Sequence, residues 1–331
     1  MVSEQIKVRG LGLCSGGLDS RLAAMVLRGQ GIHVEWVTFE TPFFSASRAR
    51  QASGLLDVPL TVRDITLPYL TMLKNPPCGY GQHMNPCLDC HTLMFRFAGE
   101  LMRERNFDFL FSGEVLGQRP MSQTRPSLRY VEKNSGYEGF ILRPLSALKL
   151  PLTIPEKEGK VRRDLLLDIA GRSRKRQIAL AKKYGITDYP APAGGCLLTD
   201  KGYSNRLKDL FEHHQDYSVN DLHLLKYGRH FRIDKATKII VGRTQQDNEN
   251  IEKLYVPAED ALVGIPKIPS PLALVRRPTG KEAVFLAAAI CAGYSKAPKN
   301  LPVEADVKDP RKKETIQVLG VSPKDLRHLL V

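Results

Sequence analysis

The stretch VRGLGLCSGGLDSRLAAMVLR, residues 8–28, decides the fold. Residues 8–13 are apolar apart from Arg9 and have the length of a short buried strand, and residues 19–28 carry apolar side chains at helical spacing. Between them, CSGGLDS combines two glycines with two serines, which is typical of a tight turn. The order predicts a strand, a loop that fits a phosphate group, and a helix.

Strand and helix patterns alternate outward from this stretch. Strands are expected at residues 33–39, 60–65, 107–111 and 140–145, and helices at residues 47–56, 88–105 and 173–184. Strands separated by helices are typical of a parallel sheet that is covered on both faces. We therefore predict an α/β, doubly wound, Rossmann-like domain at residues 1–204.

Residues 205–331 have a different pattern, with shorter elements and many basic side chains. LLKYGRHFRI and KIIVGR, residues 224–233 and 238–243, predict two strands. The last segment, DPRKKETIQVLGVSPKDLRHLLV, predicts a small terminal helix. We expect residues 205–331 to form a second, smaller, basic α+β domain.

Composition limits the function classes. A net charge of +14 favours a polyanionic partner without identifying it. No apolar run approaches the roughly 18 residues that cross a bilayer, and the first residues lack the pattern of a secretory signal. The chain is therefore expected in the cytoplasm with no membrane partner, where its six cysteines favour metal binding or thiol chemistry over disulfides.

SGGLDS, residues 15–20, predicts a phosphate site because backbone N–H groups and hydroxyls meet at the positive end of a helix. The glycines allow the backbone to approach a ligand closely, and Asp19 can hold Mg²⁺ or cap the helix. The alternative is a glycine turn before a capped helix. The candidate ligand-binding residues are Ser15, Gly16, Gly17, Leu18, Asp19 and Ser20.

The cysteines suggest a second site. Cys87 and Cys90 have the C-x-x-C spacing that lets two thiolates face one metal or cluster, at the start of a helix. Zinc would need two further ligands, for which the candidates are Cys78, His83, His91 and Cys196. Cys14 and Cys291 lie in apolar stretches and are expected to be packing residues.

SGGLDS, together with the later SGE at Ser112, Gly113 and Glu114, resembles the PP-loop ATP-pyrophosphatase superfamily over about residues 5–200. The resemblance implies an adenine nucleotide alpha hydrolase-like fold that binds ATP and Mg²⁺ at the loop, with Ser112 and Gly113 beside it. It also implies cleavage between the α- and β-phosphates, which leaves AMP on the substrate. Arg143 resembles a strand-end residue that approaches ATP or the acceptor in such enzymes; the alternative is a surface arginine.

NPCLDC, residues 85–90, resembles tRNA 2-thiouridylases, and GGCLLTD around Cys196 resembles enzymes related to 4-thiouridine synthases. These resemblances imply that Cys87, Cys90 and Cys196 bind a [4Fe–4S] cluster and, with Asp19, are the catalytic residues. The alternatives are a persulfide on Cys196 or a loop cysteine without a cluster, and a zinc site. The sulfur would come from sulfide or from a cysteine-desulfurase relay.

Residues 225–254 loosely resemble the RNA-binding module of NFACT-type proteins. RNA contact is then implied through Lys226, Arg229, His230, Arg232 and Arg243. Near residue 171 a helix start also gathers basic side chains that either contact phosphates or face solvent, namely Arg172, Arg174, Lys175 and Arg176.

These motifs together predict an ATP-dependent tRNA sulfurtransferase that adenylates a uridine carbonyl and replaces its oxygen with sulfur. One alternative is sulfur insertion into a small-molecule cofactor by the same chemistry. The other is a non-catalytic RNA-binding protein that retains a nucleotide loop.

Overall fold

The computed structural model describes residues 8–191, 196–298, 300–310 and 312–331. The chain divides into two compact units, Met1–Thr199 and Asp200–Val331, and each is described by itself.

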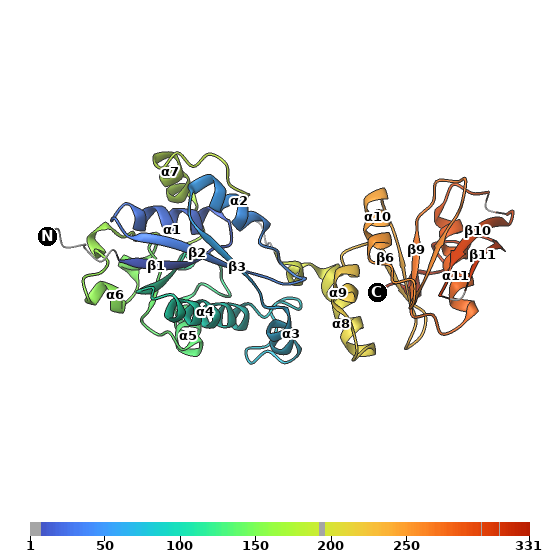
Figure 1. The fold of residues 1–331 in the computed structure, drawn as a ribbon, viewed down its shortest axis with the longest axis horizontal. Coiled ribbons are helices and arrows are strands. Elements are labelled where there is room, and N and C mark those ends of the chain that lie inside the picture. Colours follow the sequence, from blue (N-terminus) through green and yellow to red (C-terminus); the bar gives the residue numbers. More distant parts are fainter. Residues whose placement is uncertain (1–7, 192–195, 299, 311) are drawn as a thin grey trace. The chain divides into compact units, whose positions relative to one another are not determined.

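The first unit is built on a five-stranded sheet in which every neighbouring pair is parallel, in the order β3-β2-β1-β4-β5. The strands are β1 (Arg9–Leu13), β2 (His33–Glu40), β3 (Leu60–Asp64), β4 (Phe109–Ser112) and β5 (Ile141–Leu142). The helices are α1 (Leu18–Arg28), α2 (Ser47–Leu56), α3 (Thr66–Lys74), α4 (Cys87–Glu104), α5 (Arg125–Ser135), α6 (Ile154–Lys157) and α7 (Lys175–Lys183). Helices α1, α2 and α7 cover one face, and α4 and α5 cover the other (Figure 1). The predicted doubly wound α/β fold is confirmed.

Strand β1 lies at the centre of the sheet, and two of its glycines explain how its neighbour packs. A Cβ atom at Gly12 would lie 2.3 Å from the ring of Phe111, and one at Gly10 would lie 2.9 Å from the ring of Phe109. The strand order reverses between β1 and β4: β2 and β3 follow on one side of β1, and β4 and β5 lie on the other. Ligands of open α/β sheets bind beyond the carboxyl ends of the strands at such a reversal, which is where residues 14–20 and 113–124 begin.

The second unit contains a six-stranded antiparallel sheet, in the order β11-β10-β8-β9-β7-β6. Its strands are β6 (Arg229–Arg232), β7 (Lys238–Val241), β8 (Asp260–Gly264), β9 (Ala273–Arg276), β10 (Val303–Lys308) and β11 (Lys313–Val318). Its helices are α8 (Lys201–His213), α9 (Val219–Leu224), α10 (Gln245–Lys253) and α11 (Lys281–Tyr294). Apolar side chains of β7 alternate between a core with α11 and a core with α9 and α10. Cys291 is fully buried on α11, as expected for a packing residue.

Two sequence predictions were wrong in detail. The segment expected as a terminal helix forms β11, whose alternating side chains pair with β10, and only a short 3-10 turn, Arg327–Leu329, follows. The strand expected at residues 140–145 is reduced to Ile141–Leu142, because Pro144 has no N–H for a ladder.

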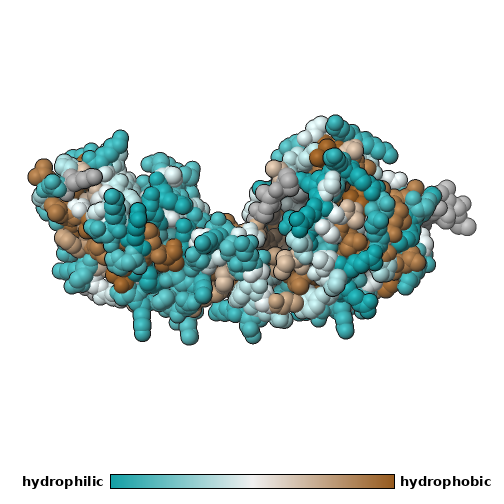
Figure 2. All heavy atoms as spheres, turned by 180° about the vertical axis from the view of Figure 1, so that it is seen from behind, coloured by the Kyte–Doolittle hydropathy of each residue, from teal (hydrophilic) through white to brown (hydrophobic). Residues whose placement is uncertain are grey.

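No helix in the described residues is long and apolar enough to cross a membrane. On the face that Figure 2 shows, hydrophilic side chains cover most of both units and apolar side chains form scattered patches.

Candidate active site

The phosphate loop has the backbone that its glycines predicted. Gly16 has a φ of +72°, and a Cβ atom there would lie 2.3 Å from the backbone of Arg48. The Ser15 hydroxyl accepts a hydrogen bond from the N–H of Gly17 (3.3 Å), and the Ser20 hydroxyl donates to the carbonyl of Gly17 (2.9 Å). Gly17 precedes α1, and no side chain caps the helix. The first N–H groups of α1 therefore lack a capping side chain, which is the arrangement that binds anions at helix N-termini.

Two other residues of this stretch belong to the packing of the loop. Leu18 as a whole is 1% exposed, and its side chain packs in the core of the unit. Cys14 is buried as expected, and burial raises the pKa of its thiol to about 11. Its sulfur accepts a hydrogen bond from the N–H of Gly16 (3.3 Å), which helps to fix the turn.

Asp19 lies among polar side chains, some of whose buried atoms have no hydrogen-bond partner in the described residues. Its Oδ2 accepts a hydrogen bond from Nε2 of Gln118 (2.9 Å), and its Oδ1 is buried with no hydrogen-bond partner in the part of the chain that the structure describes. Burial raises the pKa of Asp19, while Gln118 and the charges of Arg174 and Arg119 act in the opposite direction. Oε1 of Gln118 and Nε of Arg174 are likewise buried without a partner in this part.

Buried polar atoms without partners are costly and mark places where a ligand completes the hydrogen bonding. The Asp19 oxygen fits a cation, and the two arginines fit phosphate oxygens. Arg174 comes from the basic cluster noted in the sequence. Gln118 and Arg119 were missed, although their place directly after the SGE turn was a usable signal.

The SGE turn joins the phosphate loop to the rest of the site. A Cβ atom at Gly113 would lie 2.3 Å from the backbone nitrogen of Ser20, so only glycine lets the end of β4 lie against the loop. The hydroxyl of Ser112 donates to Oε2 of Glu114 (3.1 Å). Ser112 is 3% exposed, and its hydroxyl is bonded inside the turn. Its side chain therefore stabilises the shape of the SGE turn.

Glu114 is the centre of a buried ion-pair network. Nε of Arg143 donates to its Oε2 (2.9 Å), and Nδ1 of His91 lies 2.9 Å from its Oε1. Burial by itself would raise the pKa of Glu114, but Arg143 and His91 outweigh burial and lower the pKa to about 2. Arg143 also pairs with Glu132 and is 3% exposed, so the alternative of a surface arginine was wrong. Because His91 follows Cys90 on α4, this network connects the nucleotide loop to the cysteine helix.

Cys87 and Cys90 lie in the first turn of α4. Nδ2 of Asn85 donates to the sulfur of Cys87 (3.3 Å). Cys90 is buried and hydrogen-bonded to the side chain of Tyr69. Burial raises the pKa of the Cys90 thiol most, and the charges of Cys196 and Cys87 raise it further.

Cys196 approaches the same place from a distant part of the sequence. The N–H of Leu197 donates to the carbonyl of Phe43 (3.1 Å), and the ring of Phe43 lies 5.6 Å from the ring of Tyr69. Burial raises the pKa of Cys196 to about 11, and the charge of Cys87 adds to the effect. The three thiols are therefore close enough to influence one another's pKa, and their assignment to a common site stays a prediction.

No group of three or more His, Cys, Asp or Glu side chains within residues 8–191, 196–298, 300–310 and 312–331 is arranged to hold a metal ion. The three thiols fit an iron–sulfur cluster in kind, but the described residues do not support one by their spacing, and a cluster or zinc at Cys87, Cys90 and Cys196 stays a prediction. Cys78 is exposed, and its N–H donates to Asp89 (2.9 Å).

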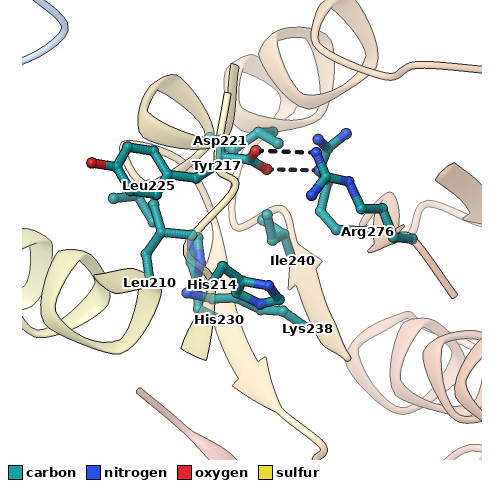
Figure 3. Close-up of a pocket in the computed structure, with 11 residues that line it drawn as sticks. Leu210, His214, Tyr217, Asp221, Leu225, His230, Lys238, Ile240 and Arg276 are labelled. Atoms are coloured by element: carbon teal, nitrogen blue, oxygen red, sulfur yellow. Dashed lines mark hydrogen bonds and ion pairs between the residues drawn. The ribbon is translucent and has the colours of Figure 1, made fainter. Parts of the chain in front are cut away.

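A small pocket in the second unit is lined by aliphatic side chains together with charged and aromatic ones (Figure 3). Its volume is about 30 Å³, which holds water molecules but no base. The charges around it are paired: Arg276 donates to Asp221 (2.9 Å), and Arg232 and Lys238 both donate to Asp209 (2.7 Å each). The charged side chains at this pocket thus belong to buried ion pairs of the second unit.

The residues predicted to contact RNA fall into two groups. His230 is 1% exposed, and burial lowers its pKa well below the usual value, so the predicted contact through its ring was wrong. Arg232 is taken up by Asp209. Lys226 and Arg229 are partly exposed and Arg243 is exposed. Arg229 lies over the ring of Tyr294 (4.5 Å), and Arg243 pairs with Asp247 (3.1 Å).

Comparisons with known families agree with both resemblances read from the sequence. Residues 5–150 match the family model described as thiamine biosynthesis protein (ThiI). Residues 228–329 match the model described as NFACT protein RNA binding domain. The chain therefore combines a ThiI-type PP-loop domain with an NFACT-type RNA-binding domain.

Solved structures show partial likeness. The C-terminal part of the fibronectin/fibrinogen-binding protein from Streptococcus suis is 14% identical with a TM-score of 0.28, over 48% of this chain and 79% of that chain. A predicted subunit of tRNA methyltransferase from Methanocaldococcus jannaschii is 14% identical (TM-score 0.35; 53% and 76%). A 4-thiouridine synthetase in complex with RNA and ATP is 20% identical (TM-score 0.36; 54% and 52%). At such scores no function follows from the likeness.

Proposed function

We propose that this chain, with its ThiI-type PP-loop domain and its NFACT-type RNA-binding domain, is an ATP-dependent tRNA sulfurtransferase that replaces a uridine oxygen with sulfur. The two family matches support ATP use, an RNA partner and tRNA thiolation at the level of the family. The observation that carries the proposal is that a chain of contacts within one unit leads from the phosphate loop through the SGE turn to the cysteines. It passes through His91, Tyr69 and Phe43. Residues 1–204 would be the catalytic domain and residues 205–331 the RNA-binding domain, in a cytoplasmic protein.

The first step is adenylation. ATP binds with its phosphates at Ser15–Ser20, where the N-terminal N–H groups of α1 and the side chains of Arg174 and Arg119 meet its charge. Asp19, through its unpartnered Oδ1, would hold Mg²⁺, which supplies charge neutralisation of the phosphates. The uridine carbonyl oxygen attacks the α-phosphorus, pyrophosphate leaves, and the carbonyl oxygen becomes part of a good leaving group.

The second step is sulfur transfer, for which we propose a persulfide on Cys196, loaded by a protein persulfide from a cysteine-desulfurase relay. Its terminal sulfur attacks the activated carbon and AMP leaves with the former carbonyl oxygen, so that Cys196 is joined to the base through a disulfide. Cys90 then attacks the Cys196 sulfur, the thiolated base is released, and a Cys90–Cys196 disulfide forms. A dithiol reductant restores both thiols. Burial raises the pKa of both thiols and keeps them protonated at rest, which protects them from unproductive oxidation.

The test is a reaction of the full chain with ATP, Mg²⁺, unmodified tRNA and a persulfide-loaded desulfurase, followed by mass spectrometry of the nucleosides. We expect thiouridine and one pyrophosphate per thiouridine. Cys196→Ser should abolish thiouridine and still release pyrophosphate. Absence of pyrophosphate release with every tRNA supplied would leave a non-catalytic RNA-binding protein, and thiolation of a small molecule without RNA would point to cofactor synthesis.

The sulfur carrier is decided by iron and acid-labile sulfide in protein purified without oxygen, compared with the Cys87, Cys90, Cys196 triple alanine variant. The persulfide route predicts that neither preparation contains iron in stoichiometric amount. About four irons per chain that are lost in the variant would replace the persulfide by a [4Fe–4S] cluster.

A further inference from the structure

Arg21, which directly follows the phosphate loop, has an unusual environment for an arginine. Its side chain lies in the first turn of α1 and is only 1% exposed. Its Nε donates to the carbonyl of Gly16 (3.1 Å), inside the loop, and its Nη1 donates to the carbonyl of Asp188. Its Nη2 is buried and has no hydrogen-bond partner in the part of the chain that the structure describes. The guanidinium therefore links two stretches that are far apart in the sequence.

The second stretch leads to Cys196. Asp188 lies eight positions before this cysteine, and its Oδ2 accepts a hydrogen bond from Nε2 of Gln51 on α2 (3.0 Å). On the other side of Cys196, the N–H of Leu197 is held by the carbonyl of Phe43 (3.1 Å). Residues 192–195 lie outside the described residues. Hydrogen bonds thus hold Asp188 on one side of Cys196 and Leu197 on the other, and Arg21 connects Asp188 to the phosphate loop.

The cost of this arrangement indicates that the connection matters. Burial lowers the pKa of Arg21, because a guanidinium loses its hydration there. An apolar side chain of similar length would fill the same space without that cost. What it would not provide is a pair of directed donors to two backbone carbonyls, which is the property that distinguishes the planar guanidinium.

We propose that Arg21 is a positioning residue that couples the phosphate loop to the Cys196 segment, so that occupation of the loop by ATP fixes the place of the sulfur-carrying thiol. The inference rests on the proposed function and deepens it. Adenylation and sulfur transfer are coupled because one side chain binds both the carbonyl of Gly16 and the carbonyl of Asp188. Arg21 touches neither ATP nor the base; it acts through Gly16 and Asp188.

The first experiment measures thiouridine formed per pyrophosphate released in the full-chain reaction. Arg21→Met keeps the length of the side chain and removes the donors, and it is expected to lower this ratio about tenfold while pyrophosphate release falls much less. Arg21→Lys should lie between, because an ammonium reaches one carbonyl and lacks the fork. Gln51→Leu, which loosens Asp188 from an exposed position, should lower the ratio in the same direction. Leu27→Ala, buried at the other end of α1, destabilises the same helix and should leave the ratio unchanged.

The second experiment does not depend on catalysis. The rate of alkylation of Cys196 by iodoacetamide is measured by peptide mapping with and without ATP, and exposed Cys78 serves as the internal control. ATP should change the Cys196 rate several-fold in the wild-type chain, and this effect should disappear in Arg21→Met while Cys78 reacts as before.

An ATP effect that is equal in wild type and Arg21→Met, or absent from the wild type, overturns the coupling, as does a ratio that falls equally in Leu27→Ala. A wild-type chain that shows the Arg21-dependent ATP effect but forms no thiouridine overturns the proposed function alone.

Discussion

At the scale of single residues, the site contains buried polar groups that destabilise the fold. Asp19 is a carboxylate in a position where burial raises its pKa, so ionised Asp19 is less stable in the folded chain than in water. In the same place Gln118 and Arg174 have unsatisfied buried atoms. A structure that needed only to be stable would not keep these groups together, whereas a site that binds a magnesium nucleotide uses every one of them.

Asp19→Asn separates the two demands. Because the folded pKa of Asp19 is raised above its unfolded value, the ionised group favours unfolding above that unfolded pKa. The asparagine removes this contribution, so the free energy of unfolding at pH 7 should stay equal or rise. ATP-dependent pyrophosphate release should fall by at least about 100-fold. Urea denaturation and a pyrophosphate assay check the two halves; a clear loss of stability would show that Asp19 is structural.

Glu114→Gln tests the network that joins the nucleotide loop to α4. The folded pKa of Glu114 is lowered to about 2 from 4.5, so its stabilising contribution is complete above pH 4.5 and is lost as the pH falls toward 2. The variant should lose roughly 3 kcal/mol at pH 7, because buried Arg143 loses its buried carboxylate partner and keeps only Glu132. Its stability should depend less on pH between 4.5 and 2.

Fluorescence of Trp36, the only tryptophan, follows this unfolding, since Trp36 is fully buried on β2. The matched control is Glu132→Gln, which removes the other partner of Arg143 at a position where the carboxylate is 23% exposed. Glu132→Gln should destabilise the chain less than Glu114→Gln, and the fall in stability between pH 4.5 and 2 should remain. Equal losses in both variants would contradict the central place of Glu114.

At the scale of elements, the sequence predicted best where a local pattern and the final environment agree. The strand, loop and helix at residues 8–28 were predicted because the pattern is local and both faces of the strand are buried. The terminal segment was predicted as a helix and forms β11, because pairing with β10 is a tertiary contact that a local pattern does not contain. Helix α3 was missed although its start carries a signal: Asp64 accepts a hydrogen bond from the N–H of Thr66 (2.9 Å), and Pro68 lies in the first turn.

The site was predictable to the same extent. Residues inside a motif, such as Gly16 and Gly113, were found because their backbone requirement is visible in the letters. Gln118 reaches Asp19 across 99 positions, and Arg21 reaches Asp188 across 167. Such contacts depend on which strands become neighbours. Burial of His230 was missed because charge on a segment does not tell whether its side chains face solvent or an internal network.

The packing of β1 against β4 gives a prediction at this scale. A Cβ atom at Gly12 would lie 2.3 Å from the ring of Phe111, so Gly12→Ala should destabilise the first unit by about 2 kcal/mol. Adding Phe111→Leu to this variant opens the space and should recover part of the loss. The control is Gly54→Ala on α2, where nothing lies within 4 Å of the added Cβ; it should stabilise the chain by up to about 1 kcal/mol. Urea denaturation followed by Trp36 fluorescence distinguishes these outcomes, and an additive double variant would contradict the clash.

At the scale of the whole molecule, each unit has its own core and its own buried ion-pair network. Glu114 and Arg143 hold the first, and Asp209 with Arg232 and Lys238 holds the second. Separate cores allow one unit to lose structure while the other keeps it. Under the proposed function, damage to the second unit should therefore weaken RNA binding and leave the nucleotide chemistry of the first unit intact.

Asp209→Asn is the variant that tests this independence. Burial opposes ionisation of Asp209, yet Arg232 and Lys238 lower its pKa to about 2, while burial lowers the pKa of Lys238 to about 8. Without the carboxylate, two largely buried cations lose their partner, and the second unit should be destabilised by roughly 3 kcal/mol. Hydrogen exchange of the full chain should show lost protection in β6 and β7, with β1 and β4 and the Trp36 transition unchanged. Binding of tRNA should weaken while ATP still changes the alkylation of Cys196.

Adding Lys238→Met to Asp209→Asn removes one of the stranded charges and should restore much of the protection, which shows that the loss comes from the unpaired cation and not from the asparagine. If β1 and β4 lose protection together with β6 and β7, the two units unfold as one, and an RNA-binding defect could no longer be separated from a catalytic one. If protection is lost only in the second unit, tRNA affinity and nucleotide chemistry can be measured independently in the same chain.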